Sequence, residues 1–156
     1  ISVMHHKKFG KLDFKKFHPA GSLGKKLKTV EDIMLTKNKI PFINENSSFN
    51  KVLNEINHKK LGLVLVRNKK KETIGIFTDG DIKRSIRNKE NFKNFKIKTF
   101  MTKNPISVDK DILAIKAISI MNEKKITSLC VRSKINKKKT IGIIHIHNLI
   151  SMDSFN

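Results

Sequence analysis

Two stretches of the chain read almost alike: TIGIFTDGDIKRSI runs from Thr73 to Ile86, and TIGIIHIHNLISM runs from Thr140 to Met152. Each begins with β-branched residues around a glycine, which is typical of a strand, and continues through a polar turn into a short helical pattern. The two glycines, Gly75 and Gly142, are 67 residues apart. A matched motif at a fixed offset indicates that one structural unit occurs twice.

The repeat continues upstream of these stretches. Met34 and Met101, each closing a short apolar segment, share the offset of 67, whereas Ile43 and Val108 are 65 apart. The second copy is therefore two residues shorter before its helix and two longer in its last loop. Compensating loop changes between matched ends favour duplication of a whole unit.

Each unit predicts the order strand, helix, strand, strand, helix. In the first, strands at 41–43, 61–66 and 73–77 accompany a helix whose stripe is Phe49, Val52, Leu53 and Ile56, with Asn46, Ser47 and Ser48 as N-cap candidates, and a second helix at 80–86. In the second, strands at 106–108, 128–131 and 140–144 accompany a stripe of Leu113, Ala117, Ile120 and Met121, and a helix at 147–152. We therefore predict an α/β (α+β) fold of two βαββα modules.

The repeat resembles the CBS domain, a module that works in tandem pairs. Three features carry the resemblance: the segment ending in Met before each first strand, the TIGIF strand, and the TDGD turn into a helix. It covers Val30 to Met152. The resemblance implies a pseudo-symmetric pair, association into homo-oligomeric dimers or tetramers, and a regulatory nucleotide as ligand, either an adenine nucleotide or a CMP-sugar.

A narrower resemblance lies in HPAGSLGKKL, from His18 to Leu27. It is similar to the junction of D-arabinose-5-phosphate isomerases, which join a sugar-isomerase (SIS) domain to a CBS pair, although Ala20 replaces the usual glycine. The IHIHNL segment also resembles the HMHDL ending of that subfamily. The resemblance implies interconversion of D-ribulose 5-phosphate and D-arabinose 5-phosphate for Kdo and lipopolysaccharide synthesis.

The division of the chain follows from both resemblances. Residues 1–28 would be the end of the SIS domain and a hinge, 29–87 the first CBS domain, 88–96 a linker, and 97–153 the second CBS domain. Phe92 and Phe95 of the linker are expected to fold back onto apolar surface. His18 matches a family histidine at the sugar-phosphate site, so it would be catalytic only in the full-length enzyme. Since the SIS domain would precede Ile1, we expect this chain alone to be inactive.

Thr78, Asp79 and Asp81 form the sharpest local feature, and two interpretations are open. In nucleotide-binding CBS pairs, the Thr and the later Asp contact phosphate and ribose, and a helix N-terminus suits an anion. The same Thr-x-x-Asp spacing is a capping box that needs no ligand. In the second unit His145 and Asn148 take these two positions. The half-sites are therefore unequal, which predicts at most one good nucleotide site, with Asn148 a weaker candidate contact.

Two further features favour ordinary roles. His145 and His147 could share one face of an extended segment, but no third or fourth ligand is apparent, so we predict no metal and assign them surface or capping roles. Cys130, the single cysteine, lies in an apolar run and is predicted to be a small buried residue.

The composition sets the remaining alternatives. The net charge of +21 comes mainly from lysines spread along the chain, with no Tyr or Trp to stack on bases. We therefore predict no specific nucleic-acid partner, and a basic nucleic-acid-binding domain is the weakest alternative. A stand-alone CBS nucleotide sensor is the stronger one. No membrane-length apolar run or signal peptide is visible, so a cytoplasmic protein is expected.

Overall fold

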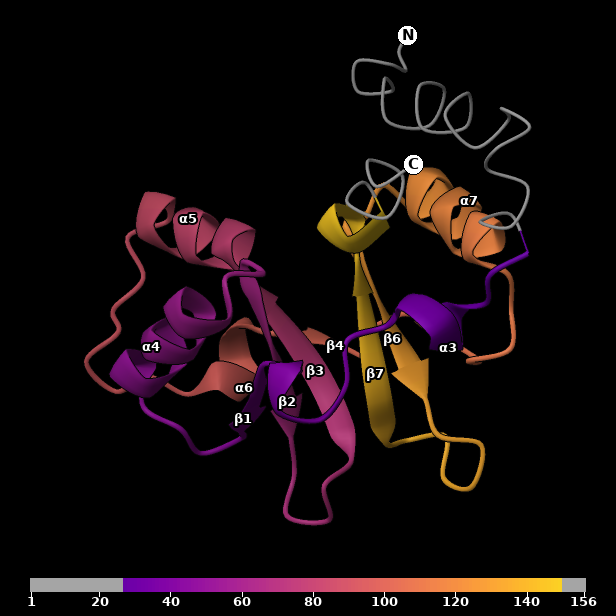
Figure 1. Ribbon diagram of the computed structural model, residues 1–156. Helices are drawn as coiled ribbons and strands as arrows, with labels where there is room; N and C mark the ends of the chain where they lie inside the picture. Colours follow the sequence, from indigo (N-terminus) through magenta and orange to yellow (C-terminus); the bar gives the residue numbers. More distant parts are fainter. Residues whose placement is uncertain (1–26, 150–156) are drawn as a thin grey trace, which may run out of the picture.

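The computed structural model describes residues 27–149, which form two similar units side by side (Figure 1). The elements of the first unit are β1 (Phe42–Asn44), α4 (Phe49–Lys59), β2 (Leu63–Arg67), β3 (Thr73–Thr78) and α5 (Asp79–Arg87). Those of the second are β5 (Ser107–Val108), α7 (Ala114–Lys124), β6 (Ser128–Arg132) and β7 (Thr140–His145), followed by helical residues 146–149. The predicted α/β pair of βαββα modules is confirmed.

Each unit has its own sheet with the same connectivity. In the first, the order is β1-β2-β3-β4, where β4 is Thr102–Lys103; in the second it is β5-β6-β7. The first two strands of each unit run parallel and the next pair antiparallel. A parallel pair needs a crossover connection, which α4 and α7 provide, whereas an antiparallel pair needs only a hairpin.

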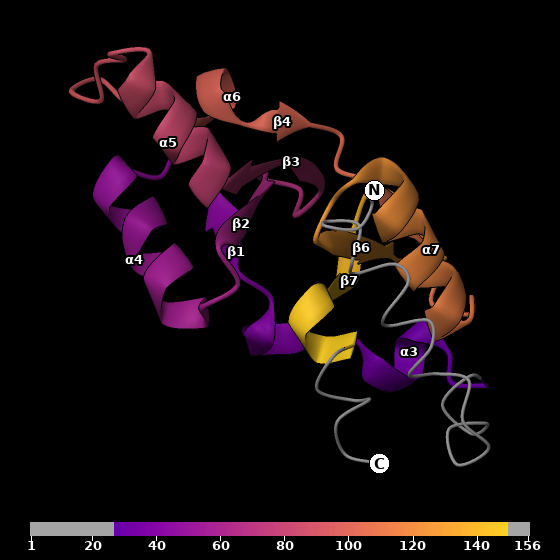
Figure 2. The ribbon, with the colours of Figure 1, turned by 90° about the horizontal axis from the view of Figure 1, so that it is seen from above.

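The segment that precedes each unit packs on the other unit. Helix α3 (Val30–Ile33) lies beside α7, and α6 (Ile97–Phe100) lies against the first sheet (Figure 2). Val30 is fully buried in the core of the second unit, and Ile97 is fully buried in the core of the first. The two units are thus tied together by exchanged segments as well as by their interface.

The exchanged segments explain the paired Met and Gly of the repeat. A Cβ atom added to Gly75 would overlap the Sδ of Met101, and one added to Gly142 would overlap the Sδ of Met34. Each methionine therefore packs on the strand glycine of the opposite unit. The two motifs keep a common offset because they are contact partners across the pair.

A third group of apolar side chains joins the two sheets. It includes Leu63 and Leu65 of β2, Cys130 of β6 and Ile143 of β7, all buried. Apolar burial of this kind is worth about 25 cal/mol per Å². The interface between the two sheets is therefore part of the hydrophobic core.

The helix predictions hold for α4 and fail in part for α7. Ser48 caps α4, since its Oγ accepts from the Lys51 N–H at 3.2 Å. In the second unit Leu113 is the N-cap and 41% exposed, and Ala114 and Ile118 are buried in its place. The backbone around Leu113 is tied to the strand-like segment at Thr29, so the helix begins one residue later than the periodicity suggested.

The linker aromatics fold back as predicted. The Phe92 ring stacks on Phe49 of α4 at a centroid distance of 4.4 Å, and Phe95 meets Phe49 at 5.0 Å and Phe77 at 6.0 Å. Aromatic pairs in this range add to the energy of area burial. The linker therefore packs against α4 and β3 of the first unit. Within residues 27–149, no helix has both the length and the apolar character needed to cross a bilayer.

Candidate functional site

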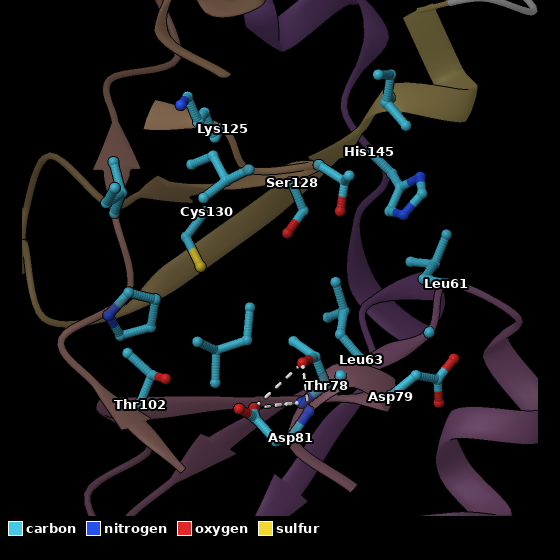
Figure 3. A pocket seen from close by; sticks show the side chains of 18 of the residues that line it. Leu61, Leu63, Thr78, Asp79, Asp81, Thr102, Lys125, Ser128, Cys130 and His145 are labelled. Atoms are coloured by element: carbon cyan, nitrogen blue, oxygen red, sulfur yellow. Dashed lines mark hydrogen bonds between the residues drawn. The ribbon is translucent and has the colours of Figure 1, made fainter. Parts of the chain in front are cut away.

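A cleft of about 910 Å³ lies between the two units, and both contribute walls. The first unit supplies the turn from β3 into α5 and the start of β2. The second supplies the start of β6 and the end of β7. Figure 3 shows Thr78, Asp79 and Asp81 facing Ser128, Cys130 and His145 across this space. The volume suits a nucleotide-sized ligand.

The predicted capping box is present on the first wall. Asp81 Oδ2 accepts from the Thr78 N–H at 2.8 Å and from its hydroxyl at 3.1 Å, while Thr78 Oγ1 accepts from the Asp81 N–H at 3.2 Å. The other carboxylate oxygen of Asp81 pairs with Arg84. Asp81 is only 8% exposed, whereas Asp79 is exposed and its carboxylate remains available to a ligand. The predicted capping box is thus present. Whether the turn also binds a ligand stays a prediction.

The equivalent turn of the second unit is built differently. Asn148 Oδ1 accepts from the His145 N–H at 3.0 Å, as Asp81 does for Thr78, but Asn148 does not line the cleft. His145 Nδ1 accepts from the His147 N–H at 3.2 Å, so the imidazole ring replaces the threonine hydroxyl as a helix cap. The capping role predicted for His145 is therefore found, whereas His147 only donates its backbone N–H and its side chain is exposed.

The surface role predicted for His145 is wrong, because this side chain is only 5% exposed. Burial lowers the pKa of His145 below its ordinary value, and the neighbouring His147 lowers it further. The two rings stack with centroids 4.8 Å apart. Since Nδ1 must be unprotonated to accept the His147 N–H, the cap requires neutral His145.

Basic residues that the sequence reading did not single out complete the cleft. Lys60 and Lys125 occupy equivalent C-cap positions after α4 and α7, with left-handed φ angles of 61° and 57°. Both line the cleft, as does Arg84, whose side chain is 60% exposed. The equivalent positions of Lys60 and Lys125 in the two repeats were the feature of the sequence that could have identified them. The lining therefore carries these three cations against the two carboxylates of Asp79 and Asp81, a small positive excess that favours an anionic ligand.

Cys130 lies at the floor of the cleft and is 3% exposed. Burial raises the pKa of its thiol to about 12, so thiolate is scarce at neutral pH. The predicted role as a small buried residue is confirmed.

His18 and nearly all of the HPAGSLGKKL segment lie outside the described residues. Among residues 27–149, no cluster of three or more His, Cys, Asp or Glu side chains is placed to hold a metal ion.

The sequence matches the CBS domain family over residues 30–88 and again over 97–154. It is 37% identical over 154 residues to the arabinose 5-phosphate isomerase KdsD of Francisella tularensis, an alignment covering 98% of this chain and 46% of that protein. It is also 37% identical to an uncharacterised protein of Rickettsia prowazekii, over 97% of this chain and 46% of the relative. The chain thus spans less than half the length of these relatives and is homologous to the C-terminal CBS region of the isomerases.

Solved structures share the fold at low identity. The CBS domain pair of protein MJ0100, in complex with 5′-methylthioadenosine and S-adenosyl-L-methionine, superposes with a TM-score of 0.72 at 18% identity, covering 83% of this chain and 98% of that one. CBSX2 in complex with AMP gives a TM-score of 0.68 at 21% identity, covering 82% and 97%.

Proposed function

The chain belongs to the CBS domain family, and we propose that it is the regulatory and oligomerising CBS pair of a D-arabinose-5-phosphate isomerase. Support comes from the isomerase relative, whose alignment over 98% of the chain must include the junction from His18 to Leu27. The parent enzyme would interconvert D-ribulose 5-phosphate and D-arabinose 5-phosphate in the cytoplasm, with His18 contributing to the sugar-phosphate site.

Proton transfer between C1 and C2 of such a sugar needs a positioned general base. The family resemblance assigns that base and the phosphate-binding loop to the SIS domain. We therefore expect the purified chain to show no isomerisation of arabinose 5-phosphate above that of a His18→Ala variant. Activity that exceeds this control would overturn the assignment of catalysis to the SIS domain.

The regulatory role rests on the cleft of about 910 Å³. We propose that it binds an adenine nucleotide or a CMP-sugar with its ribose toward Asp79 and Asp81 and its phosphate toward Thr78 and Arg84. Carboxylates accept ribose hydroxyls, and an arginine beside a helix N-terminus suits a phosphate. The bound AMP and S-adenosyl-L-methionine of the structural neighbours support this class of ligand.

Thermal unfolding with a ligand panel tests the proposal. The panel contains AMP, ADP, ATP, CMP, CMP-Kdo and arabinose 5-phosphate, and circular dichroism follows unfolding because the chain has no Trp or Tyr. A ligand at 100 times its Kd stabilises the folded state by about 2.7 kcal/mol, which raises Tm by several degrees. If no nucleotide raises Tm, the turn is a helix cap only and the pair is an assembly scaffold.

The matched variant is Asp81→Asn. Asn148 shows that an asparagine at this position can cap the helix, so this change keeps the cap and removes the negative charge. We expect Asp81→Asn to fold normally and to lose most of the nucleotide-induced rise in Tm. An unchanged ligand response in this variant would exclude Asp81 from the site.

Assembly is a second part of the proposal, since CBS pairs commonly associate. We expect a homodimer or homotetramer by analytical ultracentrifugation at micromolar concentration. A monomer at all concentrations would contradict the assembly role.

The second candidate is a stand-alone CBS sensor, which is favoured by the superposition that covers 97% of the solved CBSX2 chain. The size of the native polypeptide, measured by immunoblot of the host, distinguishes the isomerase from the stand-alone sensor. A polypeptide about twice the length of this chain supports the isomerase, whereas a band of 17.9 kDa supports the sensor.

A further inference from the structure

A second cavity of about 210 Å³ lies at the opposite end of the second sheet, near the turn between β6 and β7. Figure 1 shows both hairpin turns at this same end of the molecule. Its polar walls include Ser107 and Arg132, together with Lys137 and Lys138 of the turn. Thr73 and Thr140, equivalent residues of the two units, meet at its edge with their hydroxyls 2.7 Å apart.

The two units differ in side-chain size at two equivalent positions beside this cavity. In the first unit, Phe42 of β1 fills the space, and the Arg67 guanidinium lies 3.7 Å from the centre of its ring. In the second unit, Ser107 occupies the position of Phe42 in the same parallel pairing. Its neighbour Cys130 likewise replaces Leu65. Two smaller side chains leave room where the first unit is packed with apolar atoms.

The arginine of the second unit is turned toward this space. Arg132 Nη1 donates to the Ser107 carbonyl at 2.8 Å and to its Oγ at 3.1 Å, and Nε donates to Asp109 at 3.0 Å. These bonds fix the guanidinium plane, and Nη2 has no acceptor among residues 27–149. A fixed guanidinium with spare N–H donors is suited to bind an oxyanion.

The side chains around the cavity carry mainly positive charge, like Arg132 itself. No carboxylate from the described part of the chain lines the cavity. Three acids lie near it: Asp109 pairs with Arg132, Asp111 pairs with Lys134, and Glu72 accepts from the Asn68 amide at 3.0 Å and also lies within electrostatic reach of Lys138. The two turns at this end add further lysines, at positions 69, 70 and 71 in the first unit and 139 in the second, whereas Lys134 is neutralised by its pair with Asp111. Such a concentration of positive charge steers anions toward the cavity.

We propose that this cavity binds a phosphate-class oxyanion, either inorganic phosphate or the phosphate group of a small monoester. Arg132 would hold it through Nη2, and Lys137 and Lys138 would neutralise its charge. The size of the cavity admits a phosphate with a small substituent and excludes a nucleotide. Its charged residues, Arg132, Lys137 and Lys138, do not line the interdomain cleft, although Asn104, Pro105 and Cys130 line both spaces. The site does not depend on the isomerase assignment.

Titration of the ¹⁵N-labelled chain with inorganic phosphate, and then with glycerol 3-phosphate, tests the proposal by amide chemical shifts. Sodium chloride is adjusted to keep ionic strength constant at about 150 mM, which screens exposed charges. We expect saturable shifts confined to the amides around Ser107, Arg132 and residues 137–140. Shifts that do not saturate, or that spread evenly over the lysines, would show only ion condensation and overturn the proposal.

Ser107→Phe fills the cavity with the residue that the first unit carries at this position. We expect it to weaken phosphate binding by about tenfold or more. Lys137→Gln changes an exposed side chain and cannot disturb the core; it should weaken binding by about threefold or more. The control is Lys70→Gln, which removes the same charge from the turn of the first unit. A loss in Lys70→Gln equal to that in Lys137→Gln would refute a site at this cavity.

Discussion

The third strand of the first unit ends at Thr78, which is paired with Asp81 of the following helix, and the equivalent strand of the second unit ends at His145, which is paired with Asn148. Both pairs cap the following helix, but one cap carries a negative charge beside the cleft and the other carries a buried imidazole. A second difference is that Ser107 replaces Phe42 at the equivalent position. The Phe42 ring packs under Arg67 in the first unit, whereas a cavity lies beside Ser107 in the second. The comparison shows that duplication preserved the backbone while the two copies acquired different chemistry.

The largest expected loss of stability comes from substituting the two glycines that contact Met34 and Met101. Gly142→Ala places a Cβ against Met34 and also 3.2 Å from the Leu35 carbonyl, a backbone atom that cannot rotate away. Gly75→Ala meets the flexible Met101 side chain alone. Overpacking of this kind costs about 1–3 kcal/mol, and we expect Gly142→Ala to cost more than Gly75→Ala. Urea unfolding of both variants measures the difference; equal losses would contradict the geometry.

A smaller effect compares the two caps. Asp81→Ala removes both acceptor interactions of the capping box and the Arg84 pair, whereas Asn148→Ala removes one bond. Loss of a cap costs about 0.5–2 kcal/mol, so we expect Asp81→Ala toward the upper end and Asn148→Ala toward the lower. The control is Asp79→Ala, whose exposed side chain should leave the free energy of unfolding nearly unchanged.

A third test uses the pH dependence of the unfolding free energy to distinguish the His145 cap of the second unit from the Thr78 cap of the first. His145 has a lowered pKa when folded, so between that value and its ordinary 6.5 the unfolded chain binds a proton that the folded chain does not. The contribution of His145 to the free energy of unfolding is fully present above pH 6.5. It is lost as the pH falls through the pKa of His145 in the folded chain. His145→Thr introduces the cap of the first unit and should reduce the decline in unfolding free energy between about pH 7.5 and 5.5. An unchanged pH profile would remove His145 as its source.

The smallest effect concerns Cys130, which occupies the position of Leu65. Because its pKa is raised to about 12 and it is 3% exposed, a thiol reagent should label the native chain slowly and the urea-unfolded chain quickly. The rate of colour release from a chromogenic disulfide measures both. Rapid labelling of the native chain would show that the cleft floor opens.

The fold could be predicted from the sequence because the repeat sets two matched series of apolar residues. The exchange of α3 and α6 could not, because periodicity shows that Val30 and Ile97 are buried but not in which core. The capping box was predictable because its contacts span three residues. The cleft cations Lys60, Lys125 and Arg84 and the cavity at Ser107 depend on contacts between distant segments, which local patterns do not record. Leu113 was misplaced because a distant segment shifts the helix start.

The central claim is that the two half-sites are unequal and that the first unit carries the ligand. Isothermal titration calorimetry with the nucleotide that gives the largest rise in Tm tests it directly. We predict one molecule bound per chain, with affinity reduced about tenfold or more by Asp81→Asn and unchanged by Asn148→Ala. Two equivalent molecules per chain, or a loss caused by Asn148→Ala alone, would contradict the account.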